Sequence, residues 1–575
     1  MLDLIVRGGR VLDGTGAPER IADVGVRDGR IVAVEPDLGT DAPEVIDATG
    51  RLVTPGFVDI HSHYDGQATW DGLLEPSSGH GVTTVIMGNC GVGFAPVHPG
   101  EHEPLVRLME GVEDIPGAAL TEGLSWGWES FPDYLAALEN RHWAVDVGTQ
   151  LAHGPLRTYV MRRYDDTNGA ASADEVDRMA DLAREAVEAG AFGFTTSRTM
   201  GHKSSDGHPV PGTFAGVDEL VAIGKAVAAG GGRLMEIAPS GLARSDKPEV
   251  VAAEFDWIGR LAADTGLNTT FILLQGHHVP DRWRTEMQRA AHWRAAGASV
   301  TPLIAGRPFG VLWGWDVRHP FLARDSYRAI AHLPLPERLV HLRRPEVKEA
   351  ILAESDRYLD RGEQAQLAYI RTVLAECYPL GTPPDYEQPL ERSVGAQAQA
   401  QGRSMEDVAY DMLCQDGSML LYALYNYASH DHTVLYEQLQ DQDAVVGLND
   451  GGAHCAFICD ASIPTFMLTH WARDRARGPR LELPEVVRRL TSQPAALYGL
   501  TDRGRVQSGL RADLNVIDFD RLQLSSPRAV PDLPAGGVRL LQDATGYDAT
   551  VVAGQVTRRH GQDTGARPGR LLRRS

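Results

Sequence analysis

The chain has 575 residues, of which 43% are hydrophobic, enough for a large buried core with room for more than one domain. Its net charge of −22 argues against nucleic acid or an anionic membrane as the main partner, because both attract basic surfaces. It has no apolar stretch long enough to span a bilayer, no basic and apolar secretory start, and only five cysteines. We therefore expect a cytoplasmic protein, and the oligomeric state stays open.

Both ends of the chain predict β-structure. Residues 1–54 alternate short apolar runs with Gly and Asp-Gly turns, and residues 501–575 contain the similar runs ADLNVIDFD and YDATVVAGQVTRRHG. Two β-rich ends around a long α/β middle predict that the termini form one small composite β-sandwich. The last residues, GARPGRLLRRS, are basic, and we expect them to be a mobile tail.

The middle of the chain alternates strands with helices, which is typical of a parallel sheet. The clearest helix, 174–190, has the apolar spacing of a surface helix and ends in Gly. Eight strand and helix units would close a (β/α)8 barrel over 55–306 and 445–500, with its chemistry at the C-terminal ends of the strands. The predicted strands are Phe57–His61, Thr83–Gly88, Val145–Leu151, Phe192–Thr196, Arg233–Ile237, Thr270–Gln275, Ser299–Ile304 and Val445–Leu448.

A long segment, 307–444, separates the seventh predicted strand from the eighth. It carries helical patterns, among them PEVKEAILAESDRYLDRGEQAQLAYIRTVLAE and SMEDVAYDMLCQ. Structureless loops of this length are uncommon in compact domains. We therefore expect an inserted helical lid over the mouth of the barrel.

The first predicted barrel strand ends in His61 and His63. Alternate residues of an extended chain point to the same side, so the two imidazoles project together. Buried polar groups need partners, and a metal ion is the simplest partner that two imidazoles can share. An isolated His-x-His is more often a pair of surface histidines, but the strand before this one favours a metal site.

The surrounding phrase, TPGFVDIHSHYD (Thr54–Asp65), resembles the first-strand signature of the amidohydrolase superfamily. The phrases TTVIMGNCGVGFAPV and GVEDIPGAALTEGLSWGWESFPDYLAAL are similar to those of the D-aminoacylase family, the N-acyl-D-amino-acid deacylases. The resemblance resumes at Gly447–Asp450 and through Thr491–Asp518. It implies the same barrel and composite sandwich, one or two zinc ions or another divalent metal, and a small-molecule substrate. The implied reaction is hydrolysis of an N-acyl-D-amino acid by metal-activated water.

Two further strand ends carry candidate residues. The resemblance implies that Asp450, in VVGLNDGG, touches the metal, and a carboxylate there can accept a proton from water and return it to a leaving amine. Alone, Asp450 would be an ordinary turn residue. Cys90 follows the second strand, and the resemblance implies that its thiolate binds metal. Cysteine thiolates are common ligands of zinc. The alternative for Cys90 is a small buried hydrophobic residue.

The fifth and sixth strand ends depart from the family pattern, which has a histidine at each. Glu236 stands at the fifth position, and a carboxylate can replace imidazole on zinc. Gln275 stands at the sixth and is a poor ligand, so His277 would have to reach back to the metal. Equally, Glu236 could pair with a cation or a hydroxyl, and His277 could belong to a loop.

Arg198 and His202 follow the fourth strand and are candidates for binding the substrate. Arginine suits a carboxylate because its guanidinium donates two parallel bonds, although most arginines are solvated surface charges. The sequence thus predicts amide hydrolysis of an N-acyl-D-amino acid. The alternatives are cyclic amide hydrolysis or deamination within the same superfamily, or a catalytically weak homologue that binds a small molecule.

Overall fold

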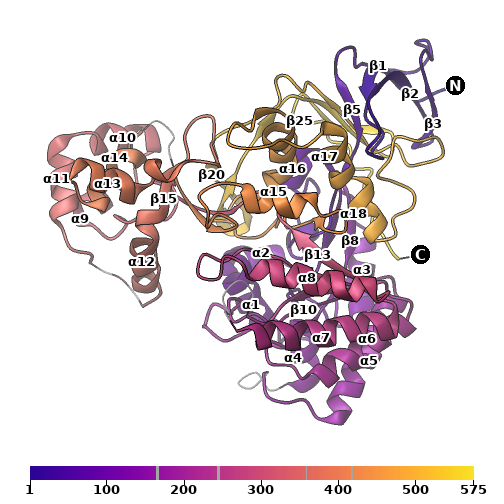
Figure 1. Ribbon diagram of the computed structural model, residues 1–575, viewed down its shortest axis with the longest axis horizontal. Coiled ribbons are helices and arrows are strands. Elements are labelled where there is room, and N and C mark those ends of the chain that lie inside the picture. The colour runs from indigo at the N-terminus through magenta and orange to yellow at the C-terminus, as the bar shows by residue number, and fades with distance from the viewer. Residues whose placement is uncertain are drawn as a thin grey trace.

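The computed structural model places the N-terminal strands and the helices of residues 325–413 (α9–α14) on opposite sides of the molecule, and the helices of residues 103–295 (α1–α8) in the lower part of the view (Figure 1). Within the described ranges, every helix is too short or too polar to cross a membrane. The structure describes residues 1–162, 168–241, 247–357, 359, 361–415, 419–456 and 458–574.

Parallel strands in chain order form the barrel. Gln150 alone separates β8 from β9, and Ser62 bridges Gly451, so the first strand lies beside the last. The predicted α/β fold class is confirmed, although the sixth strand ends at Ile272 rather than Gln275. The order is β6 (Phe57–Asp59), β7 (Val82–Met87) and β8 (Asp146–Thr149) in one sheet, then β9 (Leu151–Ala152), β10 (Gly193–Ser197), β11 (Leu234–Ala238), β12 (Asn268–Ile272), β13 (Val300–Ile304) and β17 (Val445–Val446) in the next.

Amphipathic helices connect the barrel strands. The helix predicted at 174–190 is α5, and it begins at a capping box in which Ser172 and Glu175 satisfy each other's backbone N–H groups. Its buried residues recur at helical spacing, which sets the face that packs on the sheet. The helices are α1 (Glu103–Glu113), α2 (Gly117–Gly123), α3 (Phe131–Glu139), α4 (His153–Met161), α5 (Ala173–Glu188), α6 (Val217–Ala229), α7 (Pro248–Thr265), α8 (Arg282–Ala295), α15 (Thr433–Gln440), α16 (Ile463–Phe466), α17 (Leu483–Leu490) and α18 (Ser492–Leu497).

Strands from both chain ends form one nine-stranded sheet. Strand β18 (Leu514–Ile517) pairs antiparallel with β5 (Leu52–Pro55), which joins the two ends of the chain. The composite of both termini is therefore present as predicted. Its other members are β1 (Leu4–Val11), β2 (Arg20–Arg27), β3 (Arg30–Glu35), β4 (Glu44–Asp47), β23 (Tyr547–Val552), β24 (Gln555–Arg559) and β25 (Gln562–Asp563).

The segment between β13 and β17 is not purely helical. It contains a three-stranded sheet of β14 (Phe309–Trp313), β16 (Leu420–Tyr425) and β15 (Cys377–Pro379). Its helices α9–α14 have a hydrophobic core of their own and lie to one side of the barrel in Figure 1. Helix α15 packs into the barrel core instead. That the segment acts as a lid over the mouth of the barrel stays a prediction. The helices of this lobe are α9 (Asp325–Arg328), α10 (Leu335–Leu342), α11 (Pro345–Ala353), α12 (Arg361–Val373), α13 (Val394–Gln401) and α14 (Met405–Leu413).

Part of one predicted helical stretch in this segment, at Tyr358 and Asp360, lies outside the described residues.

Before β23, the chain forms two short antiparallel pairs. These are β19 (Gln523–Leu524) with β22 (Ala544–Thr545), and β20 (Arg528–Leu533) with β21 (Gly537–Leu541).

The basic C-terminal segment is bound to the barrel rather than free. Gly569 donates its N–H to the Trp143 carbonyl at 2.8 Å, and Leu572 donates to the Val147 carbonyl at 2.7 Å. Arg574 donates its backbone N–H to the Gly190 carbonyl at 2.9 Å. The expectation of a mobile tail was therefore wrong, because these backbone donors and acceptors pair with the edge of β8 and the end of α5.

Candidate metal centre

Backbone pairing fixes the two histidines that follow β6. The His61 carbonyl accepts from the N–H of Asp450 at 3.1 Å, and the His63 N–H donates to the Gly451 carbonyl at 2.8 Å. Both imidazoles are buried, with 1% of each side chain exposed. The end of the first strand and the loop after the last strand therefore position each other, and they bring Asp450 to the histidines.

A tight turn after β7 places Cys90. Gly88, Cys90 and Gly91 all have positive φ, at 84°, 54° and 70°. A Cβ at Gly88 would lie 2.3 Å from the Gln150 carbonyl oxygen, so only glycine fits there. Cys90 is a non-glycine residue in the left-handed region, which costs conformational energy and is typical of functional sites. The turn directs the Cys90 Sγ to within 3.4 Å of the His61 Nε2.

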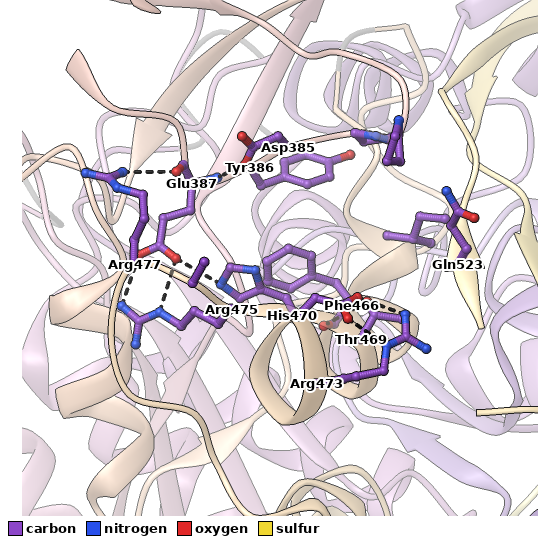
Figure 2. A pocket seen from close by; sticks show the side chains of 15 residues that line it. Asp385, Tyr386, Glu387, Phe466, Thr469, His470, Arg473, Arg475, Arg477 and Gln523 are labelled. Carbon is purple, nitrogen blue, oxygen red and sulfur yellow. Dashed lines mark hydrogen bonds and ion pairs between the residues drawn. The ribbon is translucent and has the colours of Figure 1, made fainter. Parts of the chain in front are cut away.

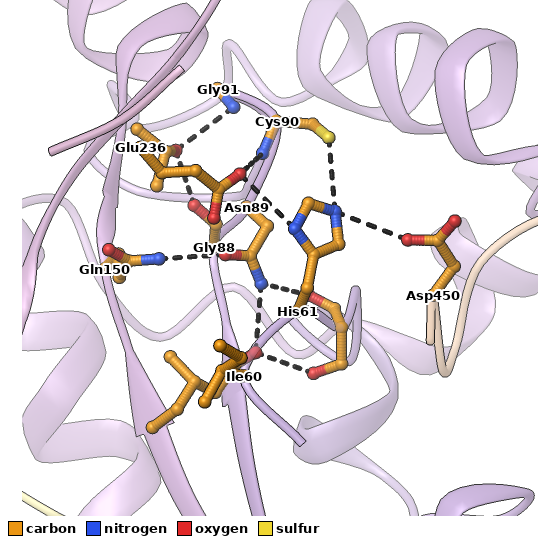
Figure 3. Close-up of polar contacts among 12 residues, drawn as sticks. Ile60, His61, Gly88, Asn89, Cys90, Gly91, Gln150, Glu236 and Asp450 are labelled. Atoms are coloured by element: carbon orange, nitrogen blue, oxygen red, sulfur yellow. Dashed lines mark hydrogen bonds and ion pairs between the residues drawn. The ribbon is translucent and has the colours of Figure 1, made fainter. Parts of the chain in front are cut away.

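Together these elements form a compact group of metal-ligating side chains. The ligand atoms of His61, His63 and Cys90 all lie within 4.8 Å of one another. The Asp450 Oδ1 lies 3.3 Å from the His61 Nε2 (Figure 3). It is also 3.7 Å from the His63 Nε2. Three potential ligands of these types fit the catalytic zinc sites of proteins, which use three protein ligands.

The electrostatics of this group favour a cation. Burial alone would lower the pKa of His61 and His63, but the anionic groups around them raise it well above its usual range. Burial would raise the pKa of Asp450, yet bonding to His63 and the charge of His61 lower it to about 2. The centre thus gathers more negative than positive groups in a buried place, which a bound cation would balance.

The chemistry of the buried atoms also fits a metal. Among the described residues, four buried atoms at this centre have no hydrogen-bond partner: His61 Nδ1, His63 Nδ1, Glu113 Oε2 and Glu236 Oε2. Native structures leave few such atoms unsatisfied. The donor set of imidazole nitrogen, thiolate and carboxylate is the one that zinc prefers.

Two residues of the centre were missed by the sequence analysis. Glu113, at the end of α1, lies with its Oε1 3.3 Å from the His63 Nδ1. His454 has its Nε2 3.7 Å from the Glu113 Oε2 and 4.0 Å from the Asp450 Oδ2. The sequence held a signal for both. Glu113 lies in the phrase over 111–138 that is similar to the D-aminoacylase family, and His454 follows Asp450 by four residues.

The sixth strand end does not contribute to the centre. Gln275 donates its N–H to Asn426 Oδ1 at 2.7 Å and accepts from the N–H of Ala428 at 3.1 Å. His277 bonds through Nε2 with the Ala423 carbonyl at 2.8 Å and stacks on Tyr422. The interpretation of His277 as a ligand is therefore corrected, because this part of the chain packs on β16 and the loop that follows it.

The two candidates for substrate binding have different surroundings. Arg198 donates to Glu254 at 2.7 Å and to the Ala215 carbonyl at 2.8 Å, so it is committed within the fold. His202 bonds with Ser197 at 2.9 Å. Burial and the charge of His454 lower the pKa of His202 to about 3. His202 is thus a neutral polar group at neutral pH, and the charges of the centre act on its pKa. The interpretation of Arg198 as a free anchor for a substrate carboxylate is corrected.

A second cluster of potential ligands lies at a cavity of about 470 Å³ between the inserted segment and the irregular helix Met467–Asp474 (Figure 2). His470 Nε2 is 3.0 Å from His432 Nδ1 and 3.2 Å from Glu387 Oε2. Arg475 donates to both oxygens of Glu387, at 3.0 and 3.1 Å. His432 bonds through Nε2 with the Tyr386 carbonyl at 2.9 Å. Protein partners thus satisfy this cluster, and Arg475 already balances its carboxylate.

We expect the cluster around Glu387 to be structural. Glu387→Ala should lower the free energy of unfolding by about 3–5 kcal/mol, because Arg475 would remain buried without its partner. Urea unfolding measures this, and Glu391→Ala, on the surface nearby, should change stability by no more than about 0.5 kcal/mol. A loss below about 1 kcal/mol in the Glu387 variant would contradict a structural role.

Comparison with known sequences identifies a protein family that fits both the fold and the candidate metal centre. A model of the Amidohydrolase family matches residues 44–558. The chain belongs to this family, as the motifs around His61 and Cys90 predicted.

Similar proteins narrow the comparison. D-aminoacylase of Alcaligenes xylosoxydans xylosoxydans is 27% identical over 100% of this chain and 98% of its own length. Two solved structures are 25% identical and cover 100% of both chains. One is a D-aminoacylase described by its binuclear metal centre, with a TM-score of 0.66. The other is N-acyl-D-glutamate deacylase from Bordetella bronchiseptica complexed with zinc and a phosphonate inhibitor that mimics the tetrahedral intermediate, with a TM-score of 0.64.

Proposed function

We propose that this chain hydrolyses the amide bond of N-acyl-D-amino acids with the help of a divalent metal ion. The observation that carries the proposal is the compact group of His61, His63 and Cys90 with the ionised carboxylate of Asp450 beside it. Similarity along the full chain to D-aminoacylase and N-acyl-D-glutamate deacylase supports the substrate class.

His61, His63 and Cys90 would hold the cation, and zinc suits their nitrogen and sulfur atoms. When bound, such a cation polarises an amide carbonyl and lowers the pKa of water. The three side chains come from two neighbouring strand ends, β6 and β7, whose backbone is fixed by strand pairing. The protein therefore presents these ligands in one geometry with little reorganisation.

Asp450 would move the proton. Its carboxylate, 3.3 Å from the His61 Nε2, accepts a proton from the attacking water as the new C–O bond forms. It then returns that proton to the amide nitrogen as the C–N bond breaks, releasing an amine and a carboxylic acid. Because its pKa is lowered to about 2, Asp450 is ionised at neutral pH and ready to act first as a base.

His202 would contact the substrate. Its ring is held by Ser197 and is neutral near pH 7, so it can offer a hydrogen bond but no charge. Arg198 is left out of the proposed site, because its guanidinium already forms an ion pair with Glu254.

A substrate panel tests the proposed function. Purified protein should release amino acid from N-acetyl-D-amino acids, more slowly from the L-enantiomers, and lose this activity when a chelator removes the metal. Adding back zinc should restore it. Full activity after thorough metal removal would contradict the mechanism. Turnover of hydantoins, dihydropyrimidines or aminated heterocycles in place of acyl amino acids would contradict the substrate class.

A further inference from the structure

Each histidine of the centre has a buried carboxylate on the far side of its ring. The Nε2 of His61 faces Cys90 and Asp450, whereas its Nδ1 lies 3.4 Å from Glu236 Oε1 (Figure 3). His63 repeats the arrangement, with Asp450 Oδ1 3.7 Å from its Nε2 and Glu113 Oε1 3.3 Å from its Nδ1. The exposed fractions of the two glutamate side chains are 0% and 2%.

The proposed cation would require one particular tautomer of each histidine. A neutral imidazole has one N–H and one lone pair, so a ring that binds a cation through Nε2 must carry its proton on Nδ1. Among the described residues, neither His61 Nδ1 nor His63 Nδ1 has a hydrogen-bond partner at full bonding geometry. The carboxylates at 3.3 and 3.4 Å are positioned to receive these protons. Such carboxylates orient a ligating histidine and increase its basicity.

Glu236 acts on two ligands at once. Its Oε1 also accepts the N–H of Cys90, at 3.3 Å. Cys90 occupies the left-handed region, so this bond helps to hold the turn that presents its Sγ. Glu236 extends from β11, in the strand-paired part of the barrel, which makes it a rigid support for the loop after β7.

Glu113 connects the second histidine to the loop that carries Asp450. The Glu113 carbonyl accepts the backbone N–H of His454, and the His454 Nε2 lies 3.7 Å from Glu113 Oε2. Because Asp450 and His454 belong to the same loop, Glu113 fixes His63 relative to the proposed base.

We propose that Glu236 and Glu113 are positioning residues that fix the tautomer and orientation of His61 and His63, in a centre that holds one cation per chain. The inference rests on the proposed function. It replaces the interpretation of Glu236 as a ligand, because its carboxylate faces Nδ1 of His61 and the Cys90 N–H rather than the side where Cys90 Sγ and Asp450 lie. Gln275, at the next strand end, is bonded to the loop after β16 and adds no ligand for a second cation.

Metal binding by four variants tests this inference. Glu236→Ala and Glu113→Ala should weaken zinc binding by about 10–100-fold, measured by competition with a chelating dye. Glu236→Gln and Glu113→Gln should recover part of the affinity, because an amide oxygen still accepts a hydrogen bond from Nδ1. Glu219→Gln, a buried carboxylate change at His153 and Arg157, is the control and should leave zinc affinity unchanged.

Cobalt substitution separates a positioning role from direct ligation. With Co²⁺, wild type and all four variants should bind one ion per chain and keep the same thiolate-to-cobalt absorption band, which Cys90→Ala should abolish. Zinc affinities within twofold of wild type for both alanine variants would overturn the inference. So would two ions in wild type with one lost in Glu236→Ala, or a cobalt spectrum that loses a ligand in that variant. If wild type binds no metal, or Cys90→Ala binds it as tightly, the proposed function fails instead.

Discussion

Asp450→Asn is expected to lower kcat for amide hydrolysis by about 10²–10⁴-fold, the usual contribution of a general acid–base group. The amide cannot accept a proton from water at neutral pH, and it cannot return one to the leaving nitrogen. It has nearly the same shape as the carboxylate, and the compact group of His61, His63 and Cys90 does not include it. Metal content should therefore stay near one ion per chain.

Initial rates and metal analysis on the same preparation check this expectation. Asp23→Asn is a matched control, because Asp23 is a buried carboxylate of the N-terminal sheet that accepts from the backbone N–H groups of Gly8 and Leu38. It should keep the wild-type kcat. An Asp450→Asn enzyme that retains kcat within a few-fold would remove Asp450 from the mechanism.

His61→Ala is the second change with a large expected effect. It removes one of three proposed metal ligands, together with the ring that Cys90 Sγ and Glu236 Oε1 face. The loss of zinc affinity should exceed the about 10–100-fold that follows removal of a supporting group, and hydrolysis should fall to background.

Zinc per chain after dialysis against a weak chelator measures this loss. His80→Gln is the control, because His80 is an equally buried histidine that bonds with Thr465 and the Gln542 carbonyl away from the centre. It should keep both zinc and activity. A His61→Ala protein that retains zinc and turnover would show that the metal lies elsewhere.

Local sequence patterns predicted the parts of the fold that depend on local chemistry. Apolar runs followed by Gly or Asp-Gly turns located the strands, and the strand-end rule pointed to His61 and His63. The family resemblance, rather than any local pattern, singled out Asp450. The same patterns could not show that Glu113 would join them. Glu113 lies on α1, about fifty residues after the histidines, and only tertiary packing of that helix against the loop after β17 brings it there.

The sequence analysis was wrong where long-range contacts decide. His277 was expected to reach back to the metal. Instead, its ring bonds with the Ala423 carbonyl and stacks on Tyr422, and both residues belong to β16. The C-terminal segment was expected to be mobile on its charge alone, yet its backbone pairs with β8. Cys90, Asp450 and His454 all have positive φ, and residue preference alone does not predict that conformation. Such departures from local rules concentrate at functional sites.

Anomalous scattering at the zinc edge from crystals of the zinc-loaded protein tests the central claim most directly. The structure predicts one strong peak per chain, about 2.0–2.1 Å from imidazole nitrogens of His61 and His63 and about 2.3 Å from Cys90 Sγ, with Asp450 beside the open position. No peak between these side chains, or a peak among Glu387, His432 and His470 in its place, would contradict it.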